Sequence, residues 1–374
     1  MANAYLEPTL QLRSEQIAAL LKPMELPPLS RQPLVSVLIA NYNYAQYIGE
    51  AIESVLRQTY QNFEIVICDD GSTDESCEVI ERYRRLESRL KLVRKQNAGQ
   101  ISASNAAFKH SEGEILCFLD ADDIFLEGKL SAVVQAFIER PQVGLVAHRV
   151  IRIDRKRKRF GTQPLLGRIP TGWLGPRLVC NGAFLQDLPP TTGLSLRREV
   201  AAKVFPLPEE RGTYTDTVIC KVVPLCTNIF GMEEAYSEYR LHGTNSHNRV
   251  SFTTDFFNLE LNSLESLWRI RMRYLESLNL ELGRLSAPFD SNMDVLMCRY
   301  AKALLEGDCA CAQYHTKLIN HPEFNQQPLM RRLFWVYSVL LPKRLFGRAL
   351  SFLFGQSSIK QMISNVQRLT AIRK

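Results

Sequence analysis

The sequence has no apolar run long enough to cross a membrane. A spanning helix needs about 20 consecutive apolar residues. The longest apolar run, 333-LFWVYSVLL-341, is preceded by two arginines and followed, after a proline, by Lys343 and Arg344. The first residues, 1-MANAYLEPTLQLRSEQ-16, lack the basic start and apolar centre of a signal peptide. We therefore expect a cytoplasmic protein that is soluble or lies on the cytoplasmic face of a membrane.

Paired cysteines are also missing. The chain has nine cysteines, an odd number, and no C-x-x-C pair. Cys68 and Cys117 lie inside apolar runs, where a reduced cysteine behaves as a small hydrophobic residue. This pattern excludes a disulfide framework and a cysteine-ligated zinc site, and it indicates a reducing compartment.

Acidic residues are absent from the last 44 residues. Residues 331–374 contain nine lysines and arginines and therefore carry a charge of +9. The whole chain has a net charge of +7, so the remaining residues sum to −2. The same segment contains Trp335, Phe346 and further apolar residues. Basic amphipathic helices of this kind bind anionic membrane surfaces, and the alternative is a basic helical cap folded onto the rest of the protein. Five consecutive cations, 155-RKRKR-159, form a second basic stretch. This stretch is either a solvated loop or a contact for an anionic acceptor or membrane.

What is present is a regular alternation of strand-like and helix-like segments. The strand-like runs are apolar on both faces, as in a parallel sheet covered by helices. A capping box, Ser72-x-x-Glu75, predicts the start of the second helix. The predicted strands are 35–40, 63–68, 90–94, 115–119 and 143–150, and the predicted helices are 44–58, 72–85, 101–110 and 129–138. We therefore predict an α/β fold with a mostly parallel sheet.

Polar residues follow each of the first four predicted strands. They are 41-NYN-43, 69-DDGS-72, 97-NAG-99 and 120-DADD-123. Ligands bind such sheets beyond the carboxyl ends of the strands, so these segments should converge on one site. Each segment alone is also compatible with ordinary turn chemistry. The crowded carboxylates of the last one repel one another, and a bound cation would remove that repulsion.

These segments resemble family 2 glycosyltransferases of the GT-A fold. The resemblance covers residues 33–248 and rests on 34-LVSVLIANYNYAQYIGEAIESVLRQTYQNFEIVICDDGSTDES-76, 97-NAGQISASNAAFKHSEGEILCFLDADD-123 and 239-YRLHGTNS-246. It implies a GT-A domain at 33–250, after an N-terminal extension at 1–32. A helical C-terminal region, 251–374, would end in the basic tail 331–374.

The resemblance also implies a nucleotide-sugar donor and a divalent cation, Mn²⁺ or Mg²⁺. Asp120 and Asp122 match the D-x-D motif, with Asp123 adjacent, and Asp122 is the residue we expect at the metal. Magnesium takes only one or two carboxylates from a protein and completes its shell with phosphate and water. The residues expected to bind the nucleotide sugar are Ala40, Asn41, Tyr42, Asn43, Asp70, which faces the base, Asn97, Gly99 and Asp120; those expected at the metal are Asp122, Asp123 and His242.

Family members generally invert the anomeric centre, which requires a carboxylate base for the acceptor hydroxyl. The best counterpart here is Asp216 in 211-RGTYTDTVICKVV-223, and Asp187 is a reserve candidate. The sequence departs from the family pattern at two positions. Ser104 stands where many members have arginine, and Thr215 stands where a carboxylate often precedes the base.

The expected function is therefore an inverting, metal-dependent glycosyltransferase. It would use a nucleoside diphosphate sugar, with UDP the expected nucleotide, and a saccharide or lipid-linked acceptor in surface polysaccharide or glycolipid synthesis. Two alternatives remain: a binding module that keeps the fold without turnover, and a nucleotidyltransferase, whose Gly-rich basic loop this chain lacks after its first strand. Nothing in the sequence indicates a nucleic-acid partner.

Overall fold

The computed structural model describes residues 15–162, 168–181, 188–209, 214–242, 252–278, 288–327 and 329–354. The chain forms two compact units. The first comprises residues 1–180, 184–241 and 266–286, and the second comprises residues 181–183, 242–265 and 287–374.

The first unit is built on one sheet. Its described strands follow the order β3-β2-β1-β4-β8-β6-β9-β5, and β7 pairs with β6 outside this path. The strands β3, β2, β1 and β4 are parallel, and antiparallel pairs begin at β8. The strand bounds are β1 Val35–Asn41, β2 Phe63–Asp69, β3 Leu90–Arg94, β4 Ile115–Asp120, β5 Ile124–Phe125, β6 Val143–Ile153, β7 Arg159–Thr162, β8 Leu194–Arg197 and β9 Asn228–Arg240.

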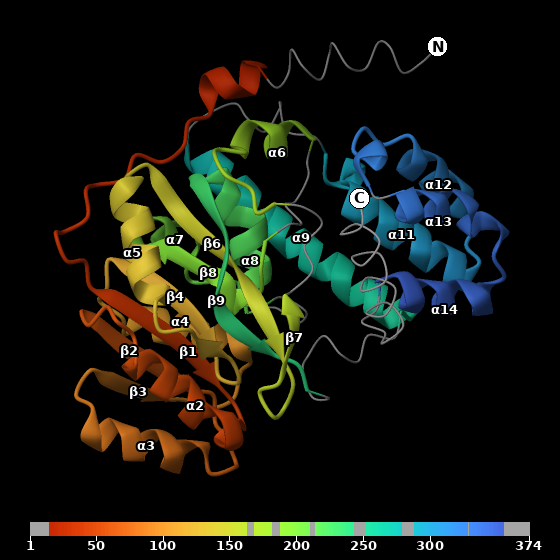
Figure 1. The fold of residues 1–374 in the computed structure, drawn as a ribbon. Helices are drawn as coiled ribbons and strands as arrows, with labels where there is room; N and C mark the ends of the chain where they lie inside the picture. Colours follow the sequence, from red (N-terminus) through yellow and green to blue (C-terminus); the bar gives the residue numbers. More distant parts are fainter. Residues whose placement is uncertain are drawn as a thin grey trace, which may run out of the picture. The chain divides into compact units, whose positions relative to one another are not determined.

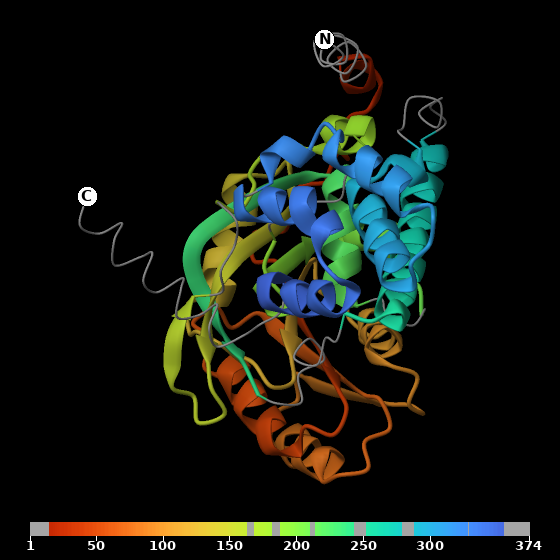
Figure 2. The ribbon, with the colours of Figure 1, turned by 90° about the vertical axis from the view of Figure 1, so that its right-hand side faces the viewer.

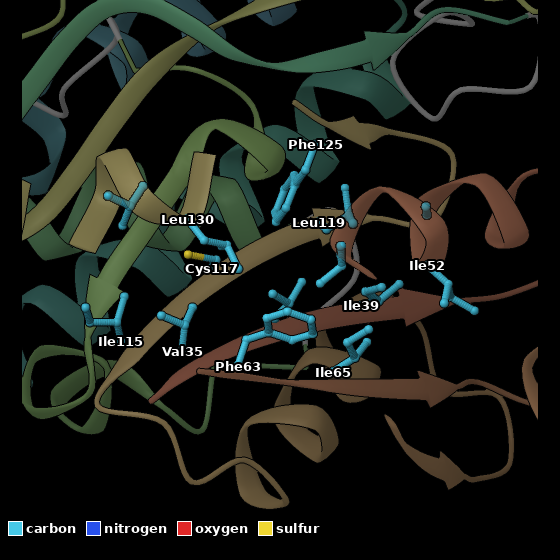
Figure 3. Close-up of a cluster of buried hydrophobic side chains, with 14 of the residues drawn as sticks. Val35, Ile39, Ile52, Phe63, Ile65, Ile115, Cys117, Leu119, Phe125 and Leu130 are labelled. Atoms are coloured by element: carbon cyan, nitrogen blue, oxygen red, sulfur yellow. The ribbon is translucent and has the colours of Figure 1, made fainter. Parts of the chain in front are cut away.

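Helices cover both faces of this sheet (Figure 1). On one face, buried side chains of β1, β2 and β4 pack against α2 and α5, and Figure 3 shows this cluster around Ile39 and Leu119. On the other face, the rings of Phe108 in α4 and Phe118 in β4 both lie beside that of Phe205. The helix bounds are α2 Ala45–Leu56, α3 Ser76–Leu86, α4 Gln100–Lys109, α5 Lys129–Glu139, α6 Gly175–Asn181, α7 Arg198–Val204 and α8 Thr215–Val222.

The predicted α/β fold class, with a GT-A sheet and a helical C-terminal region, is confirmed. The predicted capping box is wrong, because α3 begins at Ser76 and not at Ser72. The hydroxyl of Ser72 instead donates a 2.6 Å hydrogen bond to Asp69 at the end of β2. The turn therefore uses Ser72 to tie the strand end, and the helix starts after it.

The register of the parallel strands brings their carboxyl ends level. Asn41 is the direct partner of Asp69, and Ala40 is the direct partner of Asp120. On the far side of β2, Asp69 is the partner of Arg94 at the end of β3. The predicted polar segments therefore do meet at one edge of the sheet.

The second unit is helical, and its blue helices are seen clearly in Figure 2. The rings of Trp335 and Phe346 are buried, and both lie beside the ring of Tyr300. The hydroxyls of Tyr300 and Ser338 form a 2.8 Å hydrogen bond. No helix of the described residues is both long and apolar enough to cross a membrane. The helix bounds in this part of the chain are α9 Thr254–Ser277, which continues into the first unit, α11 Met293–Glu306, α12 Cys311–Ile319, α13 Leu329–Tyr337 and α14 Lys343–Phe354.

Candidate active site

A polar network closes the ends of β1 and β2. The carboxylate of Asp69 accepts hydrogen bonds from the side chains of Asn41 at 2.7 Å, Ser72 at 2.6 Å and Cys77 at 3.2 Å. Burial alone would raise the pKa of Asp69, but these hydrogen bonds hold it below its usual value. Asp69 is therefore an ionised, structural carboxylate that orients Asn41 at the site edge.

The predicted nucleoside-pocket residues lie around this network. Asn43 has a left-handed φ of 57°, and its side-chain oxygen accepts a 2.8 Å hydrogen bond from the backbone of Thr73. Asparagine tolerates this conformation better than most residues. Tyr42 is exposed, and Ala40 is half-buried on β1. The structure thus places Ala40, Tyr42 and Asn43 together, with one ring available to a ligand.

Asp70 holds the next loop in place. Its carboxylate forms a 2.6 Å ion pair with Lys95 and accepts hydrogen bonds from the backbone amides of Ala98 at 3.1 Å and Gly99 at 2.7 Å. Gly99 has a φ of 96°, which favours glycine. Asn97 is exposed in the same loop. Asp70 therefore holds the loop that contains Asn97 and Gly99 in place at the site, and it brings a charged carboxylate there.

Three carboxylates are crowded at the end of β4. Asp122 and Asp123 are buried, and Asp120 is half-buried. Burial, followed by the charges of Asp122 and Asp216, raises the pKa of Asp120 well above its ordinary value. Burial and the charges of Asp122 and Asp120 do the same to the pKa of Asp123. This part of the protein therefore has excess negative charge.

Thr192 supports two of these aspartates. Its hydroxyl donates a 2.5 Å hydrogen bond to the Asp123 carboxylate and accepts a 3.1 Å hydrogen bond from the backbone amide of Asp120. The residue lies in a short 3-10 helix, η1 Thr191–Gly193, directly before β8. A single buried hydroxyl thus links the strand end to the turn that follows it.

Arg240, the last residue of β9, supports the third aspartate, Asp122, and also contacts Asp123. Its backbone amide donates to the Asp123 carboxylate at 2.8 Å, and its guanidinium donates to the Asp122 carbonyl oxygen at 2.7 Å. The same guanidinium pairs with Glu50 of α2 at 2.8 Å and lies 4.7 Å from the centre of the Tyr47 ring. Arg240 is 1% exposed, so this cation is a fixed, internal part of the site.

Lys129, the first residue of α5, is fully buried behind the carboxylates. Its amine donates a 2.7 Å hydrogen bond to the carbonyl oxygen of Thr192 and lies 3.4 Å from the centre of the Phe125 ring. Burial lowers the pKa of Lys129 to about 7, although the charges of Asp123 and Asp120 oppose this shift. The amine is therefore only partly protonated near neutral pH, and it does not neutralise three aspartates.

Asp216 lies in the first turn of α8. Its charge contributes to the raised pKa of Asp120, so the two carboxylates share one electrostatic environment. The hydroxyls of Ser104 and Thr215 form a 2.8 Å hydrogen bond between α4 and α8. The two positions that depart from the family pattern are therefore neighbours, and a hydroxyl pair stands where the family pattern predicts an arginine and a carboxylate.

The positions of His242 and Asp187 relative to this site are not described. His242 belongs to the second unit, and Asp187 lies outside the described residues. Their assigned roles remain predictions.

The carboxylate cluster fits a divalent cation that is completed by a ligand. The described residues contain no group of three or more His, Cys, Asp or Glu side chains arranged to hold an ion by themselves. Burial and then mutual repulsion raise the pKa values of Asp120 and Asp123, and a cation placed among these carboxylates would relieve the repulsion. Asp122, assisted by Asp120 or Asp123, would hold Mg²⁺ or Mn²⁺ together with phosphate oxygens.

Sequence reasoning missed Thr192, Lys129 and Arg240. A signal for Arg240 was present, because this residue lies within the 239-YRLHGTNS-246 segment that resembles the family. Thr192 follows two prolines and Lys129 opens an amphipathic helix, and neither pattern indicates a site.

The chain is similar to known glycosyltransferases. The family model "Glycosyl transferase family 2" matches residues 36–192. An uncharacterised glycosyltransferase of Nostoc sp. is 38% identical over 223 residues, which cover 59% of this chain and 68% of that protein. Hyaluronan synthase of Pasteurella multocida is 36% identical over 134 residues, which cover 35% of this chain and only 14% of the synthase. The crystal structure of S. aureus TarS 1-349 in complex with UDP-GlcNAc has a TM-score of 0.54 at 20% identity, covering 87% of this chain and 93% of that one.

The sheet, its strand-end carboxylates and the likeness to TarS define a glycosyltransferase fold of the GT-A class. Within that class, the identity to the Nostoc protein and the family match are decisive. The chain belongs to glycosyltransferase family 2.

Proposed function

We propose that this protein is an inverting, metal-dependent glycosyltransferase that uses a UDP-linked sugar. It would extend a saccharide or lipid-linked acceptor in the synthesis of a surface polysaccharide or glycolipid. The observation that carries the proposal is the register of β1, β2 and β4, which brings Asn41, Asp69 and Asp120 to one edge of the sheet. The names of relatives support it, since one is a hyaluronan synthase and TarS was crystallised with UDP-GlcNAc.

The chain's own groups would bind the donor at the strand ends. Tyr42 is exposed beside the loop that Asp70 fixes, so its ring would lie against the nucleoside. A divalent cation held by Asp122 would supply positive charge to the diphosphate as the glycosidic bond breaks. The hydrogen bonds from Arg240 and Thr192 would keep the carboxylates in position for the ligand.

Asp216 would act on the acceptor. A base must accept the hydroxyl proton as the acceptor oxygen attacks the anomeric carbon from the face opposite the leaving nucleotide. Asp216 would be the carboxylate that takes this proton. Its neighbour Thr215 is fixed by Ser104, which would hold the first turn of α8 at the site.

A panel of nucleotide sugars with Mn²⁺ tests this function, scored by thermal shift and by released nucleotide. A donor at 100 times its Kd adds about 2.7 kcal/mol of stability. We expect Asp216→Asn to lose turnover while it keeps the thermal shift, because Asp216 acts on the acceptor side. Glu78→Gln, an exposed carboxylate change on α3, should behave like wild type. Donor binding without turnover in every protein would instead favour the non-catalytic binding module.

We also propose that the protein works in the cytoplasm and contacts the anionic face of a membrane through α13, the following 3-10 turn and α14. This segment exposes several apolar side chains: Leu329, Met330, Leu333, Tyr337, Val339, Leu340 and Leu345. Cations such as Arg331 and Lys343 are interleaved with them. Trp335 and Phe346, which the sequence suggested as membrane contacts, are instead buried inside the second unit. The apolar contact would therefore come from the exposed leucines.

Vesicle co-sedimentation tests this contact. Leu340→Ser with Leu333→Ser should weaken binding to vesicles of anionic lipid, and added salt should weaken wild-type binding. Leu86→Ser, at an 88% exposed leucine on α3, is the matched control and should bind as wild type does. Equal binding by all three proteins, or binding indifferent to lipid charge, would remove the membrane proposal.

A further inference from the structure

The turn that joins β6 to β7 carries four of the five consecutive cations, residues 155–158, and the fifth, Arg159, is the first residue of β7. Figure 1 shows this hairpin beside β9. All five residues are exposed. Asp154 defines the turn, because its carboxylate accepts hydrogen bonds from the backbone amides of Lys156 at 2.8 Å and Lys158 at 2.9 Å. These two hydrogen bonds to Asp154 therefore fix the backbone of the turn.

The structure uses two of the five cations internally. The buried carboxylate of Glu238, on β9, forms a 2.7 Å ion pair with Arg157 and a 2.6 Å ion pair with Arg159. Glu238 is 2% exposed, so this pairing anchors the hairpin to β9. Among the described residues, no ion pair is formed by the other three: Arg155, Lys156 and Lys158.

This turn is attached to the carboxylate site. The Arg240 guanidinium donates to the Asp122 carbonyl oxygen at 2.7 Å and to the Arg155 carbonyl oxygen at 3.1 Å. One side chain therefore separates the basic turn from the D-x-D segment. A group bound by the turn would lie beside the place where the sugar is transferred.

We propose that Arg155, Lys156 and Lys158 bind an anionic saccharide acceptor, one that carries carboxylate or phosphate groups along its chain. This inference rests on the proposed function and names its acceptor class. A membrane fits this turn less well, because interfacial binding needs apolar burial together with charge. The turn offers one exposed aromatic ring, Phe160, which lies beside the guanidinium of Arg152. Three cations on a fixed turn instead match repeated anionic groups of a chain.

The binding test uses the whole 374-residue chain and defined oligomers without a donor. The probes are a galacturonate hexamer, which supplies carboxylates, a glycerol-phosphate oligomer, which supplies phosphates, neutral maltohexaose, and vesicles of anionic lipid. The test variant is Arg155→Gln with Lys156→Gln and Lys158→Gln, which leaves the backbone hydrogen bonds of the turn in place. The control replaces three exposed cations of α3 and α4, Arg82, Arg85 and Lys109, by glutamine. The basic tail is common to all three proteins, so its background binding cancels.

We expect the turn variant to bind at least one anionic oligomer about tenfold more weakly than wild type and control, a loss typical of a few exposed ion pairs. The oligomer that loses affinity identifies carboxylate or phosphate as the acceptor group. Maltohexaose should not distinguish the proteins. Equal binding of both anionic oligomers by all three proteins would overturn the proposal, as would weakened binding of anionic vesicles alone. Nucleotide release from the donor by the wild type and the α3/α4 control tests the proposed function separately; its absence in both would count against the glycosyltransferase function and leave the oligomer result standing.

Discussion

The hydroxyl of Thr192 offers a direct test of how the carboxylate site is held together. Thr192→Val keeps the shape of the side chain and removes only the hydroxyl. The Asp123 carboxylate then loses its 2.5 Å donor, and the backbone amide of Asp120 loses its 3.1 Å acceptor. Leaving a buried polar group without its partner costs about 2 kcal/mol, so the two losses together should destabilise the first unit by about 4 kcal/mol.

For a unit of about 260 residues, each kcal/mol corresponds to about 2 °C in Tm, so Tm should fall by about 8 °C. Differential scanning calorimetry would measure the transition of the first unit. Thr191→Val is the matched control, because Thr191 is the buried neighbour on the same 3-10 helix. Thr192→Ser keeps a hydroxyl and should recover most of the loss. The reasoning is refuted if Thr192→Val and Thr191→Val melt within about 1 °C of each other, a difference well below one hydrogen bond.

Three further predictions concern the metal and the base. Asp122→Asn should abolish the stabilisation by Mn²⁺ with UDP while Tm without metal stays near wild type, and full activity in EDTA would contradict this assignment. The affinity for Mn²⁺ should fall as pH is lowered, because Asp120 and Asp123 have raised pKa values and a cation must displace their protons. Isothermal titration calorimetry from about pH 5 to about pH 8 should show this loss of affinity. An affinity that does not change with pH would exclude these residues as ligands. Ser104→Ala removes the hydrogen bond that positions α8, so it should lower kcat while changing the donor KM less. Adding Thr215→Val should have little further effect, because both changes break the same hydrogen bond.

The strand and helix pattern was predictable because each element carries its own signal. The strands of the parallel sheet are apolar on both faces, and the helices show apolar residues on one side. The convergence of Asn41, Asp69 and Asp120 follows from parallel strands that begin at a common level. Ser72 misled the prediction of the second helix, since a serine hydroxyl can either cap a helix or bond within a turn.

The support of the carboxylates was not predictable from local pattern. Thr192 is 69 residues from Asp123 along the chain, and Arg240 is 117 residues from it. A lone threonine or a strand-end arginine is common in any sequence, so its partner is known only once the sheet has formed. The same holds for the contact between Ser104 and Thr215, which are 111 residues apart.

Chemical labelling of the buried Lys129 amine can report when this region of the protein opens. Burial lowers the pKa of this amine to about 7, and that shift is lost whenever the amine becomes exposed to water. The side chain is 0% exposed, so an amine reagent reaches it only when the surrounding structure opens. The rate at which Lys129 is labelled therefore reports how often the strand ends open, and a ligand that binds there should slow that rate in proportion to its occupancy.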